Sequence, residues 1–196
     1  MKRTALMLAL IFTCGGWTAA EARWLQFDVA EIAHVRDASG EIDPERSKFV
    51  FDETPADQNG LPAYGTEFVS QGVIYEYGTL TCGENGCNGV NPDGTPEFPD
   101  KVIGTWTCRG WFIGKGAQTT TGAWVVTTQL YEFGNTPGAE TLTTEGTELA
   151  DVNVPILRAI TGGTGRYSRA RGELAQTLLG FNVVEGVALR FTTDTK

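Results

Sequence analysis

One carboxylate lies among apolar residues of a strand-like segment and is the strongest candidate for chemistry in this sequence. Over residues 24–35, alternate positions place Glu31 on the same face as Phe27 and Val29. Burial raises the pKa of a carboxyl group, and groups with perturbed pKa values cluster at functional sites. Glu31 is therefore a candidate general acid or base. The alternative is a structural glutamate that reaches a backbone amide or an arginine.

Arg109 and Arg171 are the candidate electrostatic partners of Glu31, because an ion pair would offset the cost of burying its charge. Glu185 repeats the pattern of one acid on an apolar face, but it lies close to a turn and is free to reach water there. Apolar and thiol side chains at strand-like positions are expected to line a binding site, and these are Phe27, Trp106, Cys108, Phe112 and Tyr131.

Several familiar chemistries do not fit the sequence. One histidine would have to serve any catalytic triad, and there is no Gly-x-Ser-x-Gly motif. The glycine-rich residues 162–165 lack the Lys-Ser/Thr ending of a phosphate-binding loop. Residues 91–94 resemble part of a calcium loop but lack its first acidic ligand, so a plain turn is expected. We expect no bound metal and no cofactor.

The cysteines favour an oxidising compartment. Cys82 and Cys87 bracket a flexible four-residue loop that a disulfide would close, which leaves Cys108 free or paired between chains. A zinc site is the competing interpretation of the Cys82–Cys87 spacing. It lacks ligands, because His34 is distant in sequence and a tetrahedral site usually has four donors.

The N-terminus is typical of a secretory signal peptide. Basic residues at positions 2 and 3 precede a short apolar run and then small residues, with cleavage expected after Ala20 or Ala22. This predicts a signal peptide over residues 1–22, a β-barrel domain over 23–196, and a secreted or periplasmic protein. An N-terminal helix of the mature fold and lipidation at Cys14 are the alternatives.

The overall charge limits the partners. The formal net charge of the 196-residue chain is −9, which repels phosphate backbones and anionic lipid surfaces. We therefore expect no nucleic-acid partner. No segment is apolar for the roughly 20 residues that a spanning helix needs, so we expect no membrane span.

Short strand-like segments separated by turns dominate the chain, and helical periodicity is nearly absent. The pattern predicts an all-β fold, as a sandwich or barrel, with no internal domain boundary. The eight predicted strands, with a possible short extra one over residues 49–51, are 24–35, 66–77, 102–113, 123–133, 140–149, 154–160, 173–179 and 183–193.

The segment 154–177, VPILRAITGGTGRYSRARGELAQT, resembles a repeated theme of the allene oxide cyclase and dirigent superfamily. That theme is an apolar strand, a Gly-Gly-Thr/Ser-Gly corner, an aromatic residue and a second strand opened by Ala-Arg-Gly. The first strand, with Glu31 followed by Arg36 and Asp37, is similar to the family's opening strand. The resemblance implies a single eight-stranded antiparallel β-barrel that assembles as a homotrimer.

The resemblance also implies a function. Glu31 falls on the strand-one glutamate with which allene oxide cyclases help to open an epoxide, and Arg171 falls on an arginine that dirigent proteins use. Ala33 departs from the cyclase pattern, which has asparagine there. We therefore expect a barrel that binds a small apolar molecule and promotes or steers its cyclisation or isomerisation. The alternative is a non-catalytic barrel that binds a small ligand or a surface partner.

Overall fold

The computed structural model describes residues 25–51, 62–114 and 122–193. The predicted signal peptide, residues 1–22, and Cys14 lie outside the described residues. No helix in the described part of the chain is long and apolar enough to cross a membrane.

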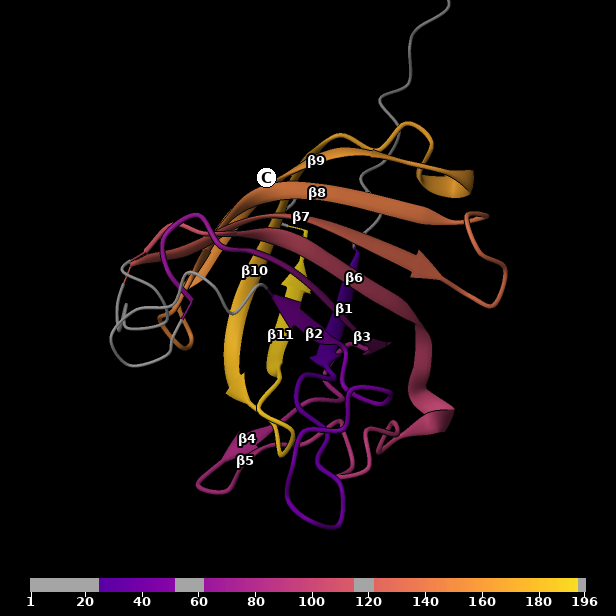
Figure 1. Cartoon of the computed structure of the whole chain (residues 1–196). Helices are drawn as coiled ribbons and strands as arrows, with labels where there is room; N and C mark the ends of the chain where they lie inside the picture. Colours follow the sequence, from indigo (N-terminus) through magenta and orange to yellow (C-terminus); the bar gives the residue numbers. More distant parts are fainter. Residues whose placement is uncertain (1–24, 52–61, 115–121, 194–196) are drawn as a thin grey trace, which may run out of the picture.

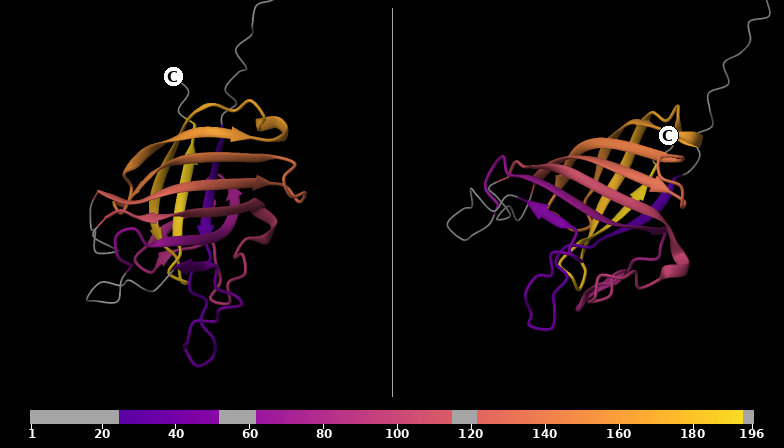
Figure 2. Two further views of the ribbon diagram at one scale, coloured as in Figure 1. Left: turned by 45° about the horizontal axis from the view of Figure 1, so that its top comes forward. Right: turned by 45° about the vertical axis from the view of Figure 1, so that its right-hand side comes forward.

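Eight antiparallel strands form a closed barrel, which confirms the predicted all-β fold class (Figures 1 and 2). Each strand pairs with the next, and the last pairs again with the first. Around the barrel they are β1 (Gln26–Glu31), β11 (Val187–Thr192), β10 (Gly172–Phe181), β9 (Pro155–Gly163), β8 (Thr141–Leu149), β7 (Ala123–Phe133), β6 (Val102–Phe112) and β3 (Glu67–Glu76).

Short elements supplement the barrel. Strand β2 (Phe49–Phe51) pairs with the first half of β3, beyond the part that pairs with β1. Strands β4 (Cys82–Gly83) and β5 (Gly86–Cys87) form a small separate hairpin. In the described part of the chain, two 3₁₀ turns lie in connections between strands: η1 (Pro99–Lys101) and η3 (Gly165–Tyr167).

The first and last predicted strands are several residues shorter in the structure than in the sequence pattern. Strand β1 ends at Glu31, and the chain then turns away so that the Lys48 amide donates to the Ile32 carbonyl. Strand β11 begins only at Val187, because Glu185 has a φ of 62° in the turn before it. A positive φ ends extended backbone, so Glu185 belongs to a hairpin turn.

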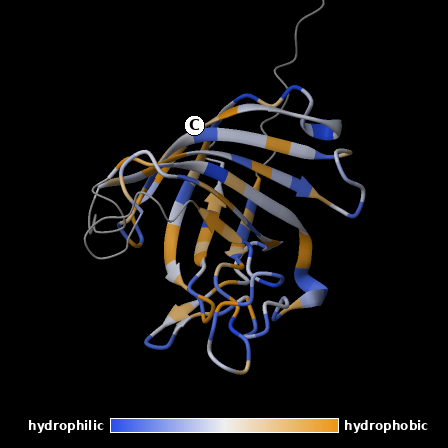
Figure 3. Ribbon diagram, in the orientation of Figure 1, coloured by the Kyte–Doolittle hydropathy of each residue, from blue (hydrophilic) through white to orange (hydrophobic). Residues whose placement is uncertain are grey.

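Hydrophobic and hydrophilic residues both occur along the strands of the barrel (Figure 3). The period-two alternation of the strands sorts side chains between the lumen and the exterior. In β6, for example, Trp106, Cys108 and Phe112 are buried inside the barrel, whereas Arg109 and Trp111 are exposed outside. The alternation therefore gives one mostly apolar lumen, on which any internal site must be built.

One end of the lumen is filled with aromatic rings. Phe27 stacks on Phe191 with ring centroids 4.9 Å apart, and it meets Tyr131 edge-on at 5.0 Å. Phe133 packs against the same ring at 5.5 Å. All four side chains are buried, so this end of the barrel is a packed core.

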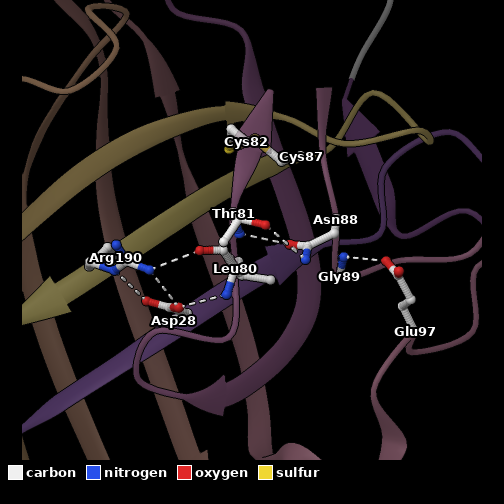
Figure 4. Close-up of a disulfide and its surroundings, with 9 residues drawn as sticks. All are labelled: Asp28, Leu80, Thr81, Cys82, Cys87, Asn88, Gly89, Glu97 and Arg190. Carbon is white, nitrogen blue, oxygen red and sulfur yellow. Dashed lines mark hydrogen bonds and ion pairs between the residues drawn. A yellow bond between two sulfur atoms is a disulfide. The ribbon is translucent and has the colours of Figure 1, made fainter. Parts of the chain in front are cut away.

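A second apolar layer covers the outside of the barrel at β1, β3 and β11. Leu80 packs over this face, and its amide donates to the buried carboxylate of Asp28 (2.9 Å). Arg190 pairs with Asp28 across the β1–β11 ladder and also donates to the Leu80 carbonyl (Figure 4). The neighbouring Cys82–Cys87 disulfide closes the β4–β5 hairpin. Both faces of β1 are therefore buried.

Candidate functional site

A cavity of about 240 Å³ occupies the end of the lumen opposite the packed aromatic rings. Its wall is mostly apolar, and it reaches the surface beside Glu185, whose side chain is 58 % exposed. Carboxyl groups of Glu31 and Glu148 interrupt the apolar wall. The other described residues that line it are Ala33, His34, Phe49, Phe51, Pro62, Phe68, Trp106, Cys108, Phe112, Trp124, Val125, Phe181 and Val187.

Glu31 is the last residue of β1, and hydrogen bonds from both neighbouring strands hold its side chain. The Ser70 hydroxyl of β3 donates to one carboxyl oxygen, and the Val187 amide of β11 donates to the other (2.8 Å). Burial raises the pKa of Glu31 above its ordinary value, and these two hydrogen bonds only partly oppose that effect. The negative charge of Glu148 raises the pKa further.

Glu148 lies in β8 and is held by several donors at once. The Thr127 hydroxyl donates to Oε1 (2.6 Å) and Gln129 Nε2 donates to the same oxygen (2.8 Å). Gln176 Nε2 donates to Oε2 (3.0 Å), and the Cys108 thiol lies 3.8 Å from Oε1. These hydrogen bonds from β7 and β10 hold the Glu148 carboxyl group in one position.

Arg158, on β9, balances the charge of Glu148. Its side chain has no exposed surface, and Nη1 lies 3.6 Å from Glu148 Oε1. Nε donates to the Thr144 hydroxyl (3.0 Å) and Nη2 donates to the Thr127 carbonyl (3.1 Å). Arg158 thus forms a buried ion pair with a lining residue, Glu148, but is not itself among the residues that line the cavity.

Amide and ring donors join this ion pair to the packed aromatic end. Gln129 Oε1 accepts from Trp106 Nε1 (3.2 Å) and from the Tyr131 hydroxyl. Gln129 Nε2 also donates to Gln176 Oε1 (3.0 Å). A continuous polar layer therefore crosses the lumen between the cavity and the packed rings, and it fixes the rotamers of the groups that face the cavity.

A second charged group lies at the mouth of the cavity. Glu185 accepts from Arg36 Nη2 (3.1 Å) and lies 3.1 Å from His34 Nδ1. These contacts, with that to His34 foremost, lower the pKa of Glu185. The turn before β11 is thereby tied to the segment after β1, on the rim of the cavity.

The structure brings together only some of the predicted site residues. Trp106, Cys108 and Phe112 line the cavity with Glu31, whereas Phe27 and Tyr131 belong to the packed end. Burial raises the pKa of the Cys108 thiol well above its ordinary value, which favours its neutral form.

The predicted arginine partners of Glu31 are elsewhere. Arg109 is exposed on the outer face of β6, and Arg171 is exposed, donating to the Ala170 carbonyl (2.6 Å). Strand alternation explains why Arg109 points outward, because it directly follows Cys108, which faces the lumen. Neither arginine reaches Glu31, whose polar contacts are neutral donors.

Glu148 and Arg158 were not selected from the sequence, although strand alternation contained a signal for both. Glu148 has the same parity in β8 as the buried Leu142 and Thr144. Arg158 stands two residues before the buried Ile160 in β9. A charged residue on an apolar strand face is buried at low cost only if an opposite charge lies beside it. Here that partner is on another strand, so the pair can be recognised only once the order of the strands around the barrel is known.

The site as a whole can exchange a proton inside an apolar cavity. Glu31 offers a carboxyl group whose neutral form is favoured, and Glu148 offers a fixed anion nearby. Two carboxyl groups in contrasting environments are typical of acid–base sites. Among the described residues, no three His, Cys, Asp or Glu side chains are grouped so that they could hold a metal ion.

Comparisons with known proteins concern the fold. No family model matches the chain, and a search of curated proteins found no match. The pterocarpan synthase dirigent protein PsPTS1 has 15 % sequence identity, and the match covers 86 % of this chain and 90 % of that one with a TM-score of 0.58. GePTS1, another pterocarpan synthase dirigent protein, has 13 % sequence identity. Its match covers 86 % of this chain and 83 % of that one, with a TM-score of 0.55.

A solved structure named pyocyanin demethylase also matches, at 13 % identity and a TM-score of 0.49, over 87 % of this chain and 99 % of that chain. The dirigent matches agree with the resemblance seen in residues 154–177 and with the observed strand order. At these identities the comparisons establish fold alone. The chain therefore has the eight-stranded antiparallel barrel fold of the dirigent proteins.

Proposed function

We propose that this protein binds a small, mostly apolar molecule inside its barrel and promotes or steers its cyclisation or isomerisation through proton transfer at Glu31. The observation that carries the proposal is the cavity, whose apolar wall is interrupted by Glu31 and Glu148. Its volume of about 240 Å³ is below the usual range of sites for drug-sized ligands. The size favours a small occupant of up to three rings.

The proposed mechanism needs no external oxidant or reductant. Glu31 donates its proton to an oxygen or double-bond carbon of the substrate, and the resulting carboxylate takes a proton from a neighbouring atom as the new bond forms. The substrate's atoms and electrons are conserved, as isomerisation requires. Glu148 stabilises the positive charge that develops between these steps. General acid–base catalysis contributes roughly 10²- to 10⁴-fold, and confinement of the substrate adds to it.

Binding without reaction is the second candidate. The many contacts of Glu148 support it, because the polar layer also has an evident structural purpose in joining four strands. The two candidates share the cavity and differ in the role of Glu31. A reaction needs its carboxyl group, whereas simple retention of an apolar ligand needs only the wall.

The cavity can be tested with N-phenyl-1-naphthylamine, a neutral apolar molecule that fluoresces when it leaves water. Val187→Phe fills the cavity without removing the backbone amide that holds Glu31. We expect it to weaken probe binding about tenfold or more. Val154→Phe, at an exposed position just before β9, is the matched control and should bind like the wild type. If the wild type does not bind the probe, or if Val187→Phe binds it equally well, the cavity is not a binding site.

The disulfide supports the proposal that the protein is exported. Disulfides such as Cys82–Cys87 persist in oxidising compartments and are rare in the cytosol. Exported protein should then begin near Glu21 or Arg23. A mass spectrum of exported material that still begins at Met1 would remove the signal-peptide interpretation.

Exposed apolar side chains support the proposal of a homotrimer. Val50 and Val69 are cross-strand partners on the outer faces of β2 and β3, and Trp111 and Val126 are partners on β6 and β7. A contiguous apolar surface of this kind commonly marks an interface. Sedimentation at micromolar concentration should give three times the mass of one chain, and the mass of a single chain would contradict the proposal.

A further inference from the structure

The lining of the cavity combines aromatic rings and carboxyl groups, and His34 is the basic side chain among its described residues. Among the described residues that line it, none is lysine or arginine. Rings surround most of the space, and the carboxyl groups lie at its inner end and mouth. The rings belong to Phe49, Phe51, Phe68, Trp106, Phe112, Trp124 and Phe181, and the carboxyl groups to Glu31, Glu148 and Glu185.

The three carboxyl groups differ in how their charge is balanced. Glu148 is paired with Arg158, behind the wall. Glu185 is paired with Arg36 and His34 at the rim. Glu31 is the exception, because its hydrogen-bond donors, the Ser70 hydroxyl and the Val187 amide, are both neutral. A buried carboxyl group without a cationic partner either stays neutral or waits for a cation to arrive with a ligand.

We infer that the occupant of this cavity is a small planar aromatic base or organic cation, whose positively charged nitrogen pairs with Glu31 while its rings pack against the aromatic wall. The inference rests on the proposed function and specifies the class of substrate. Aromatic faces attract cations, and the attraction is strongest where both groups are removed from water. Among the described lining residues, an anion would meet three glutamates and one basic side chain, His34, which already contacts Glu185. We therefore expect the cavity to disfavour carboxylates and phenolates.

Proton exchange follows from this pairing. A permanent cation displaces the proton of Glu31, whereas a weak base takes that proton for itself and becomes the cation. The charged and titratable groups that face Glu31 are Glu148 from β8, Cys108 from β6 and His34 from the segment after β1. Burial raises the pKa of Glu31, which extends to higher pH the range in which its carboxyl group carries a proton.

Four probes of similar size separate the contributions of shape and charge. 1-Methylquinolinium is a permanent cation, 1-methylnaphthalene is its neutral counterpart of the same shape, quinoline is a weak base, and 1-naphthoate is an anion. We expect 1-methylquinolinium to bind about tenfold tighter than 1-methylnaphthalene or more. 1-Naphthoate should bind most weakly of the four. Calorimetry at one pH in two buffers of different ionisation enthalpy should detect a proton released by 1-methylquinolinium and none released by quinoline.

Glu31→Gln tests whether the carboxyl group of Glu31 pairs with the positive charge of the ligand. The amide can donate to Ser70 Oγ and accept from the Val187 amide, so the shape of the site is kept. The variant should lose the preference for 1-methylquinolinium and the proton release, while it keeps its affinity for 1-methylnaphthalene. Glu145→Gln, an exposed residue of β8, makes the same change of sequence on the outside of the barrel. It controls for general attraction of cations by the acidic chain.

The outcomes distinguish this inference from the proposed function. Tighter binding of the cation with proton release, lost in Glu31→Gln and kept in Glu145→Gln, supports the inference. Equal or tighter binding of 1-methylnaphthalene without proton release overturns it and leaves the proposed function standing. If neither these probes nor N-phenyl-1-naphthylamine binds, the proposed function fails and the inference with it. The proton measurement uses the wild type, so it remains decisive even if Glu31→Gln does not fold.

Discussion

Glu31 and Glu148 face the same cavity but are held in contrasting ways. Glu31 receives two neutral donors at the end of β1, whereas Glu148 receives an arginine, two glutamine amides and a threonine hydroxyl. Burial raises the pKa of Glu31, whereas the Glu148 carboxyl group is surrounded by donors and lies 3.6 Å from Arg158 Nη1. This contrast, rather than the presence of acids as such, is what makes the cavity suited to moving a proton.

The raised pKa of Glu31 predicts a specific pH dependence of stability. The folded protein holds this proton more tightly than the unfolded chain, whose pKa is near the ordinary 4.5. As pH rises above that value, unfolding becomes more favourable until the folded-state pKa is passed. Relative to wild type, Glu31→Gln should therefore gain stability over this window and then level off. Urea unfolding from pH 4 to pH 8 measures the difference, and a difference independent of pH would show that the pKa of Glu31 is unperturbed.

Arg158→Met should destabilise the fold strongly. The substitution leaves Glu148 as a buried charge without its cation, and breaking such a pair typically costs about 3–5 kcal/mol. Adding Glu148→Gln should recover part of the loss, because the remaining group is no longer charged. Denaturant unfolding of the two single variants and the double variant measures the coupling. A double variant as unstable as the sum of the single variants would mean that the two charges do not interact.

At the scale of elements, the sequence predicted strands better than side-chain partners. The period-two pattern located β7 at residues 123–133 without error, and it put Trp106, Cys108 and Phe112 on the lumen face of β6. It overextended the last strand through Glu185, because nothing in the local pattern reveals that this residue has a positive φ. It chose Arg109 as a partner of Glu31, although the partner of a buried charge depends on which strands close the barrel.

The β4–β5 hairpin illustrates how a small element secures a barrel wall. Its disulfide lies against Gly180 of β10, where an added Cβ would be 2.9 Å from Cys87 Sγ. Asn182, just after β10, forms an isolated bridge with Cys87, and its side-chain amide donates to the Glu31 carbonyl (2.8 Å). The hairpin is thereby linked to the backbone of the residue that faces the cavity.

Removal of the disulfide should cost a moderate amount of stability. Closing so short a loop restricts the unfolded chain by about 2 kcal/mol in the chain-entropy model. Cys82→Ala/Cys87→Ala should therefore lower the free energy of unfolding by about that amount while the cavity still binds N-phenyl-1-naphthylamine. Urea unfolding with and without reductant is the measurement, and reductant should have no effect on the variant. A loss of probe binding would show instead that the hairpin shapes the cavity.

At the scale of the whole molecule, the two ends of the barrel differ. One end is packed with Phe27, Tyr131, Phe133 and Phe191, and the other holds the cavity. The polar layer around Gln129 separates them. A fully packed lumen would maximise stability, so the unfilled end, together with the unpaired carboxyl group of Glu31, points to binding as the reason for the space.

The close approach of β1 and β3, which closes the barrel next to Glu31, requires a glycine at position 72. Gly72 in β3 pairs with Glu31 on one side and with Trp106 on the other. A Cβ there would lie 2.3 Å from the Ala30 carbonyl oxygen and 2.9 Å from the Glu31 Cα, so the backbones of β1 and β3 would have to separate. The separation would also disturb the hydrogen bond from Ser70 to Glu31.

Gly72→Ala should therefore weaken folding and binding together. Overpacking of this kind typically costs about 1–3 kcal/mol, and the affinity for N-phenyl-1-naphthylamine should fall with it. Gly83→Ala is the matched control, because no atom lies within 4 Å of the position that its Cβ would take. It should melt and bind like the wild type. Thermal melts and probe titrations of both variants measure these effects. A Gly72→Ala protein that melts and binds like the Gly83→Ala control would show that β1 and β3 can accommodate the methyl group. Close packing at Gly72 would then not govern the cavity.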